Sequence, residues 1–89
     1  MDVISVDDAS LKQAICNLEK LAQDANTITL RLESDCNSVK SGLDETLQRD
    51  VSAFTDSAKS YNQMIQKYVS ENIQALRDRL AKLDRYSSL

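Results

Sequence analysis

The chain has 89 residues with one Gly and no Pro, His or Trp, and its 14 acidic and 11 basic side chains give a formal net charge of −3. This length allows one small domain, and a composition so poor in chain-breaking residues favours long helices over sheet. Charges of both signs are interspersed along the chain, so no face is basic enough to bind phosphates. We therefore expect no nucleic-acid partner.

No apolar run approaches the ~20 residues that a membrane-spanning helix needs. The start of the chain lacks the positive charge followed by an apolar stretch that marks a cleavable signal peptide. We therefore expect a protein without a membrane span that is cytoplasmic when made. Secretion, if it occurs, would use a route that needs no cleavable signal.

The first predicted element is a helix over about residues 5–40. Its start has the capping-box pattern Ser5-Val-Asp-Asp8 with Ile4 before it, and Ser10-Leu-Lys-Gln13 is an alternative start one turn later. A period near seven is typical of a helix that buries one side against other helices. The apolar rows that repeat at this period are Leu11, Leu18, Ala25, Leu32 and Val39, with Ala14, Leu21 and Ile28 beside them.

Next comes Gly42, the only glycine, within Ser41-Gly-Leu-Asp44, which again has the capping-box form. A glycine can end one helix in a left-handed conformation, and Ser41 or Gly42 could cap the next helix. The pattern predicts a turn at about residues 41–42 and hence a hairpin. The alternative is one continuous helix through Gly42, which costs only about 1 kcal/mol.

The second predicted helix covers about residues 43–86. Its apolar residues are separated mainly by steps of four between Tyr61 and Ile73, which disfavours a long regular two-stranded coil. If the hairpin folds about residues 41 and 42, the numbers of facing residues add to about 83, and residues from about Arg79 onward overhang the first helix. The apolar stripe comprises Leu47, Val51, Phe54, Ala58, Tyr61, Ile65, Val69, Ile73, Leu76, Leu80 and Leu83.

Two helices cannot enclose a core, and each apolar stripe is wide enough to contact more than one neighbour. We therefore expect an all-α, single-domain helical hairpin that pairs with a second chain into a four-helix bundle. The predicted partner interface comprises Leu11, Leu18, Leu21, Ile28, Leu32, Val51, Phe54, Tyr61, Ile65, Val69, Ile73 and Leu76.

The residue types that carry out chemistry are sparse. There is no His, no Gly-rich phosphate loop and no nucleophile elbow, and the carboxylates alternate with Lys and Arg as on a solvated face. We expect no enzymatic activity, no cofactor and no metal site. Cys16 and Cys36 are 20 residues apart, which is about 30 Å along one helix and too far for a disulfide. They are expected to be reduced apolar residues, with an intermolecular bridge as the alternative.

With these features in place, the chain resembles the small WXG-type proteins of bacterial type VII secretion and the helical adaptors of LXG-type toxins. The opening Ile4-Ser-Val-Asp-Asp-Ala-Ser-Leu11-Lys-Gln-Ala14 has their apolar, acidic and then Leu/Ala-rich pattern. Lys40-Ser41-Gly42 corresponds to the Trp-x-Gly of the family's turn but lacks the Trp. The resemblance covers nearly the whole chain, as a pattern of residue class and spacing.

The family's export signal is an aromatic residue followed four positions later by Asp. The chain has Leu80-Ala-Lys-Leu-Asp84 without the aromatic, and Tyr68-Val-Ser-Glu-Asn72 without the acid. Leu80 and Asp84 are thus export-signal-like, or alternatively a core leucine and a surface acid. These departures fit an adaptor, or one half of a heteromeric pair, better than a self-sufficient substrate.

The resemblance implies a protein partner: a second copy, a sister hairpin, or the N-terminal helical domain of an LXG-type toxin. Two structural alternatives remain. One is a filament subunit like a type III secretion needle protein, whose turn usually contains Pro, and the other is a coiled-coil subunit of an intracellular scaffold.

Overall fold

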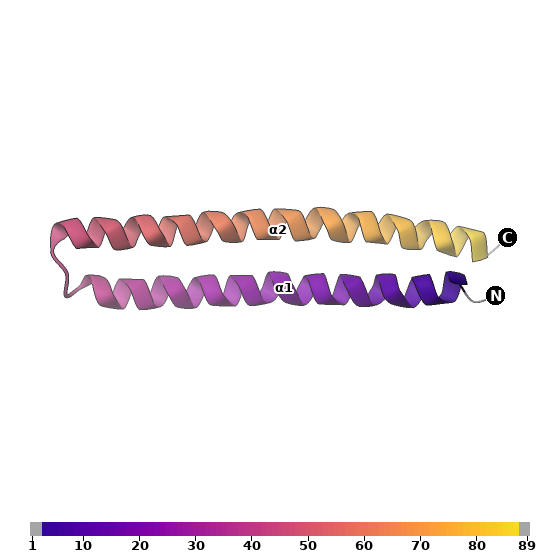
Figure 1. The fold of residues 1–89 in the computed structure, drawn as a ribbon, viewed down its shortest axis with the longest axis horizontal. Helices are drawn as coiled ribbons and strands as arrows, with labels where there is room; N and C mark the ends of the chain where they lie inside the picture. The colour runs from indigo at the N-terminus through magenta and orange to yellow at the C-terminus, as the bar shows by residue number, and fades with distance from the viewer. Residues whose placement is uncertain (1–2, 88–89) are drawn as a thin grey trace.

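The computed structural model describes the backbone of residues 3–87 and the side chains of residues 8–85. Helix α1 (Val3–Lys40) and helix α2 (Glu45–Ser87) lie antiparallel, side by side along their whole lengths (Figure 1). The molecule is a rod with extents of 68 × 15 × 13 Å, and the start of α1 and the end of α2 lie at the end opposite the loop. The predicted all-α hairpin is confirmed, and a continuous helix through Gly42 is excluded.

Helix α1 is longer, and the loop wider, than the sequence pattern indicated, whereas α2 has nearly the predicted length. Helix α1 already includes Ser5, so this residue does not cap the helix from outside, although its side chain and that of Ile4 fall outside the described side chains. The loop occupies residues 41–44, and α2 begins two residues later than expected. None of the helices in the described part of the chain is long and apolar enough to cross a membrane.

The register between the helices differs from the predicted one by about one turn. Asn62 donates a hydrogen bond of 2.8 Å to Asn26, and Gln66 donates one of 2.8 Å to the carbonyl of Ala22. The numbers of both facing pairs add to 88, and not to about 83. The four-residue loop accounts for part of this difference, because the residues that flank it, Lys40 and Glu45, have numbers that add to 85.

The shifted register also removes the predicted overhang. Since α1 begins at Val3, it extends alongside the last turns of α2. Leu80 and Leu83 are half-buried, and Leu83 shares a surface hollow with Ser10 and Leu11. The prediction that residues from Arg79 onward lack an intrachain neighbour is therefore wrong.

The two helices meet along one seam, in which buried and half-buried residues alternate in steps of three and four. The sequence pattern predicted an irregular stripe in α2, and this prediction is wrong. The seam residues of α2 are regularly spaced, because polar residues occupy seam positions that the apolar pattern had assigned to their neighbours. On α1 the seam is formed by Leu11, Ile15, Leu18, Ala22, Ala25, Thr29, Leu32 and Cys36. On α2 it is formed by Gln48, Val51, Thr55, Ala58, Asn62, Ile65, Val69, Asn72, Leu76 and Leu83, with Ile73 and Leu80 at its margin.

Very little of this seam is sealed from solvent. Among the described residues only Ile15 (8% exposed), Val69 (2%) and Thr55 (8%) count as buried. The Thr55 hydroxyl donates to the carbonyl of Val51 at 3.0 Å, and Thr29 donates to Ala25 at 2.7 Å. Each threonine thus satisfies its hydroxyl within its own helix, which allows a polar residue to occupy an apolar seam.

The hairpin therefore exposes more surface than a compact protein of its mass. Its accessible surface is 6934 Å², whereas a compact monomer of its 10.0 kDa mass exposes about 5,200 Å². The excess of roughly 1,700 Å² is larger than the ~800 Å² that each partner buries in a standard-size protein–protein interface. The hairpin thus exposes enough surface to form an interface with a partner.

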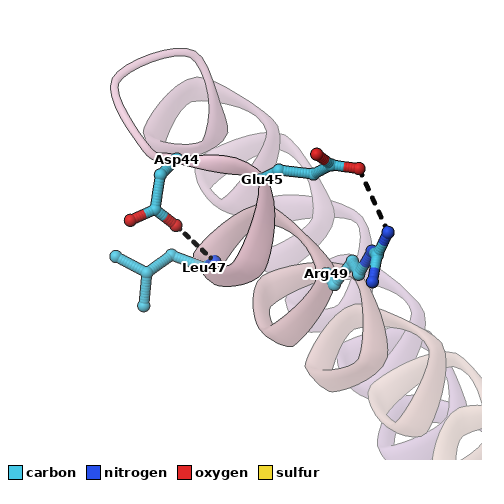
Figure 2. Close-up of polar contacts among 4 residues, drawn as sticks. All are labelled: Asp44, Glu45, Leu47 and Arg49. Carbon is cyan, nitrogen blue, oxygen red and sulfur yellow. Dashed lines mark hydrogen bonds and ion pairs between the residues drawn. The ribbon is translucent and has the colours of Figure 1, made fainter.

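The loop is closed by side chains that satisfy both helix ends. Asp44 is the N-cap of α2, because its Oδ1 accepts a hydrogen bond of 2.9 Å from the backbone N–H of Leu47 (Figure 2). Glu45 follows in the first turn, where a negative charge complements the helix dipole, and Arg49 pairs with it at 3.1 Å (Figure 2). The prediction that Ser41 or Gly42 caps α2 is therefore wrong.

On the other side of the loop, Gln48 reaches back to the end of α1. Its Nε2 donates to the carbonyl of Lys40 at 3.1 Å and to that of Leu43 at 2.9 Å. Backbone bonds from Gly42 to Val39 and from Leu43 to Lys40 tighten the last turn. No glycine among the described residues has a positive φ, so Gly42 ends α1 without the expected left-handed conformation.

Candidate partner-binding face

A second apolar row, separate from the seam, runs along the surface of each helix. On α2 its members are seven residues apart, which is about two helical turns, so they lie on one side of the helix. Their exposed fractions range from 46% for Leu47 to 68% for Tyr61, values too high for residues packed against α1. We call the two rows together the exposed apolar face: Leu21 and Ile28 from α1 with Leu47, Phe54, Tyr61 and Tyr68 from α2.

Both rows lie on the same side of the hairpin. On each helix, every residue of the exposed row is followed in the sequence by a seam residue. Tyr61 is followed by Asn62 on α2, and Ile28 is followed by Thr29 on α1. In an antiparallel pair of helices, rows that are equivalent in this way meet on one side of the seam. A surface hollow that spans both helices on this side supports the placement, and it is lined by Asp35, Cys36, Val39, Asp50, Val51 and Phe54.

The opposite side of the seam is polar and already paired. Lys59 forms an ion pair with Glu33 at 3.1 Å, and Arg77 forms one with Glu19 at 3.5 Å. Asn26, which accepts the hydrogen bond from Asn62 of the seam, is seven residues before Glu33 and lies on the same side. Exposed ion pairs of this kind contribute only about 0–1 kcal/mol each. They nevertheless give charged side chains on this side partners within the chain itself. We call this side the paired polar side.

The predicted interface residues fall into two groups in the structure. Eight of the twelve lie at the seam inside the hairpin, and four lie on the exposed apolar face. The seam group is Leu11, Leu18, Leu32, Val51, Ile65, Val69, Ile73 and Leu76. The exposed group is Leu21, Ile28, Phe54 and Tyr61.

Sequence reasoning left Leu47 and Tyr68 out of the interface, although both belong to the exposed apolar face. Their spacing of seven residues from Phe54 and Tyr61 was the signal that could have identified them. Met64 also extends the apolar surface of α2, with 66% of its area exposed. It lies three residues after Tyr61, a spacing that places both on one side of a helix.

The export-signal-like pair lies near the start of α1. Leu80 is half-buried at the margin of the seam, and Asp84 is exposed. The hydrogen bond to Asp8 and the charge of that carboxylate raise the pKa of Lys12 above its ordinary value, and the charge of Asp84 adds a smaller contribution. Asp84 is therefore close enough to the first turns of α1 to act on Lys12.

The remaining candidate groups do not gather into a site within the described residues. Ser41 and Gly42 both lie in the loop, exposed to solvent. Cys16 is exposed and Cys36 half-buried, and both are free thiols. No group of three or more His, Cys, Asp or Glu side chains in residues 8–85 is arranged to hold a metal ion.

These features define the chain as a coiled-coil-like helical hairpin with one paired polar side and one exposed apolar face. No family model, curated protein or solved structure matches it.

Proposed function

We propose that the protein is a non-catalytic binding module whose exposed apolar face packs against helices of another polypeptide to complete a four-helix bundle. The observation that carries the proposal is the concentration of exposed large apolar residues on one side of the hairpin. Contiguous exposed apolar surface is characteristic of interaction sites, whereas isolated exposed apolar residues are common.

The form of the face favours a helical partner. Its residues repeat every seven positions along a rod, and helices are the elements whose side chains can interdigitate with such a row over several turns. Aromatic side chains, here Phe54, Tyr61 and Tyr68, are enriched among the residues that dominate binding energy.

We further propose that the biological setting is bacterial type VII secretion, with the chain acting as a WXG-like substrate or as a targeting adaptor for an LXG-type toxin. Support comes from the hairpin, from Lys40-Ser41-Gly42 at the end of α1 and the start of the loop, and from the acidic-to-apolar opening of the chain. The degraded export signal at Leu80 and Asp84 favours the adaptor role, in which a partner supplies the complete signal.

Two neighbouring residues on α1 provide a matched test of the binding face. Ile28 and Leu30 have exposed fractions of 66% and 67%, but Leu30 lies two residues further along and therefore on a different side of the helix. Ile28→Ser should abolish complex formation, whereas Leu30→Ser should leave it intact although it costs slightly more helix propensity. Complexes are measured by sedimentation and by copurification of the full-length chain from its host. Equal effects of the two variants would refute the assigned face.

The secretion setting requires a separate experiment in the host. The chain and its copurifying toxin are followed in the culture medium of strains with and without the membrane ATPase of the secretion system. Loss of toxin export on deletion of this gene supports the adaptor role, and ATPase-dependent appearance of the chain itself supports the substrate role. Unchanged export of both proteins in every strain would refute the type VII proposal. Sedimentation as long polymers would instead favour the filament alternative.

A further inference from the structure

The exposed apolar face carries an unbalanced set of charges. Asp35 continues the row of Ile28 by seven residues, and other charged residues lie three positions after members of the face, on the same side of the helix. All of them are exposed. Within seven residues of a member of the face, four of the charged residues at these spacings are acidic and one is basic: Asp24, Asp35, Asp50 and Glu71, with Arg31.

Among residues 8–85, the charges of the exposed apolar face are not used in ion pairs between the two helices. Within the described side chains, none of the five takes part in an ion pair. The cross-helix pairs Lys59–Glu33 and Arg77–Glu19 lie on the paired polar side instead. The carboxylates of the exposed apolar face thus remain available to a partner.

A second copy of the chain is a poor occupant for this face. A symmetric dimer brings the same patch of both copies together, so each copy would contribute four carboxylates and a single guanidinium to one interface. Like charges that meet across an interface oppose association. An anionic membrane surface would be repelled by the same carboxylates.

The hollow near the loop indicates how a better-matched partner would be held. Its apolar lining offers a pocket for one large side chain, and pockets of this kind hold the anchoring residues of interfaces. Asp35 and Asp50 are among its lining residues, one from each helix. A basic group beside the anchor would form charge-assisted contacts with these two carboxylates.

We propose that the occupant is an amphipathic helical segment of a different protein, with Lys or Arg residues flanking its apolar stripe and an apolar anchor seated between Val39 and Phe54. This inference rests on the proposed function and adds the chemistry of the partner. It assigns the chain to heteromeric pairing, directed by the acidic margin of the exposed apolar face.

Two synthetic helical peptides with the same apolar stripe test the inference directly. One carries Lys at the flanking positions and the other carries Glu. Binding to the full chain is measured by fluorescence anisotropy at salt concentrations of about 0.01 M and about 1 M, where screening lengths are ~30 Å and ~3 Å. The Lys peptide should bind at least about tenfold more tightly at low salt, and the preference should shrink at high salt.

Paired substitutions on α2 identify which carboxylates matter. Asp50→Asn should weaken binding of the Lys peptide by about threefold. Asp56→Asn makes an equal charge change at an exposed position on the paired polar side and should leave this binding unchanged. Neutralising all four acids (Asp24→Asn, Asp35→Asn, Asp50→Asn and Glu71→Gln) should strengthen self-association of the chain by at least about tenfold in sedimentation equilibrium.

The outcomes separate this inference from the proposed function. Equal binding of both peptides, together with tight wild-type dimers unaffected by neutralisation, would overturn the charged heteromeric partner and leave helix pairing standing. If neither peptide bound and Ile28→Ser altered no association, the exposed apolar face would not be a binding surface, and both proposals would fail.

Discussion

Replacing Gly42 by Ala is a sensitive test of the loop conformation, because the two possible backbone conformations predict opposite signs. Gly42 does not have a positive φ, and a Cβ built there lies 3.9 Å from the carbonyl oxygen of Val39, an ordinary van der Waals contact. Alanine therefore fits without strain and reduces the entropy of the unfolded chain. Gly42→Ala should raise the free energy of unfolding by about 0.4–1 kcal/mol.

The assay is thermal unfolding followed by circular dichroism, with scans at several protein concentrations because association also stabilises the folded state. For a domain of this size the expected rise in Tm is about 2–8 °C. Ala53→Gly, at an exposed position in α2, calibrates the measurement with an expected loss of about 1 kcal/mol. A fall in Tm for Gly42→Ala would mean that Gly42 adopts a left-handed conformation, which would contradict the backbone geometry of this loop.

Three further predictions concern the cap, the seam and the paired polar side. Asp44→Ala removes the N-cap of α2 and should cost about 1 kcal/mol in denaturant unfolding, while Asp44→Ser should recover most of it; equal losses would exclude a capping role. Val69→Ala, at the most buried position, should cost about 1.5–2.5 kcal/mol, whereas Tyr61→Ala should cost the isolated chain under about 0.5 kcal/mol; a reversed order would show that Tyr61 is part of the hairpin's own core. Glu33→Gln and Lys59→Gln should show a coupling free energy of only about 0.2–1 kcal/mol in a double-mutant cycle, which falls as salt is added; a salt-independent coupling would contradict an exposed pair.

The hairpin could be predicted from the sequence because two long apolar stripes flank one glycine, and no other arrangement lets both stripes meet within the chain. The register could not be predicted, since it depends on the loop length, and the capping pattern at Ser41 competed with the cap at Asp44. A serine and an aspartate are both good caps, so local preference alone does not choose between them. The wider loop that ends at the Asp44 cap is one source of the shift in register.

The division of the apolar residues into seam and exposed face was also hidden in the sequence. Tyr61 and Phe54 are more apolar than Asn62 and Thr55, so the apolar pattern assigned the former pair to the seam. In the structure Asn62 and Thr55 lie at the seam, where Asn62 donates a hydrogen bond to Asn26 and the Thr55 hydroxyl donates to the carbonyl of Val51 in its own helix. The larger aromatic side chains remain exposed on the surface, where a partner could cover them.

Because the hairpin has no enclosed interior, each turn of α1 contacts only the few turns of α2 opposite it. Stability in such an arrangement is nearly a sum of local terms along the rod, as in repeat proteins. The loop end is covalently closed and capped by Asp44 and Gln48, whereas at the far end no loop joins α1 to α2. Backbone amide hydrogens should therefore exchange fastest at the far end and progressively more slowly towards Val69 and Ile15. If a partner binds near the loop, α1 and α2 could still separate and re-form their contacts at the far end, independently of the bound end.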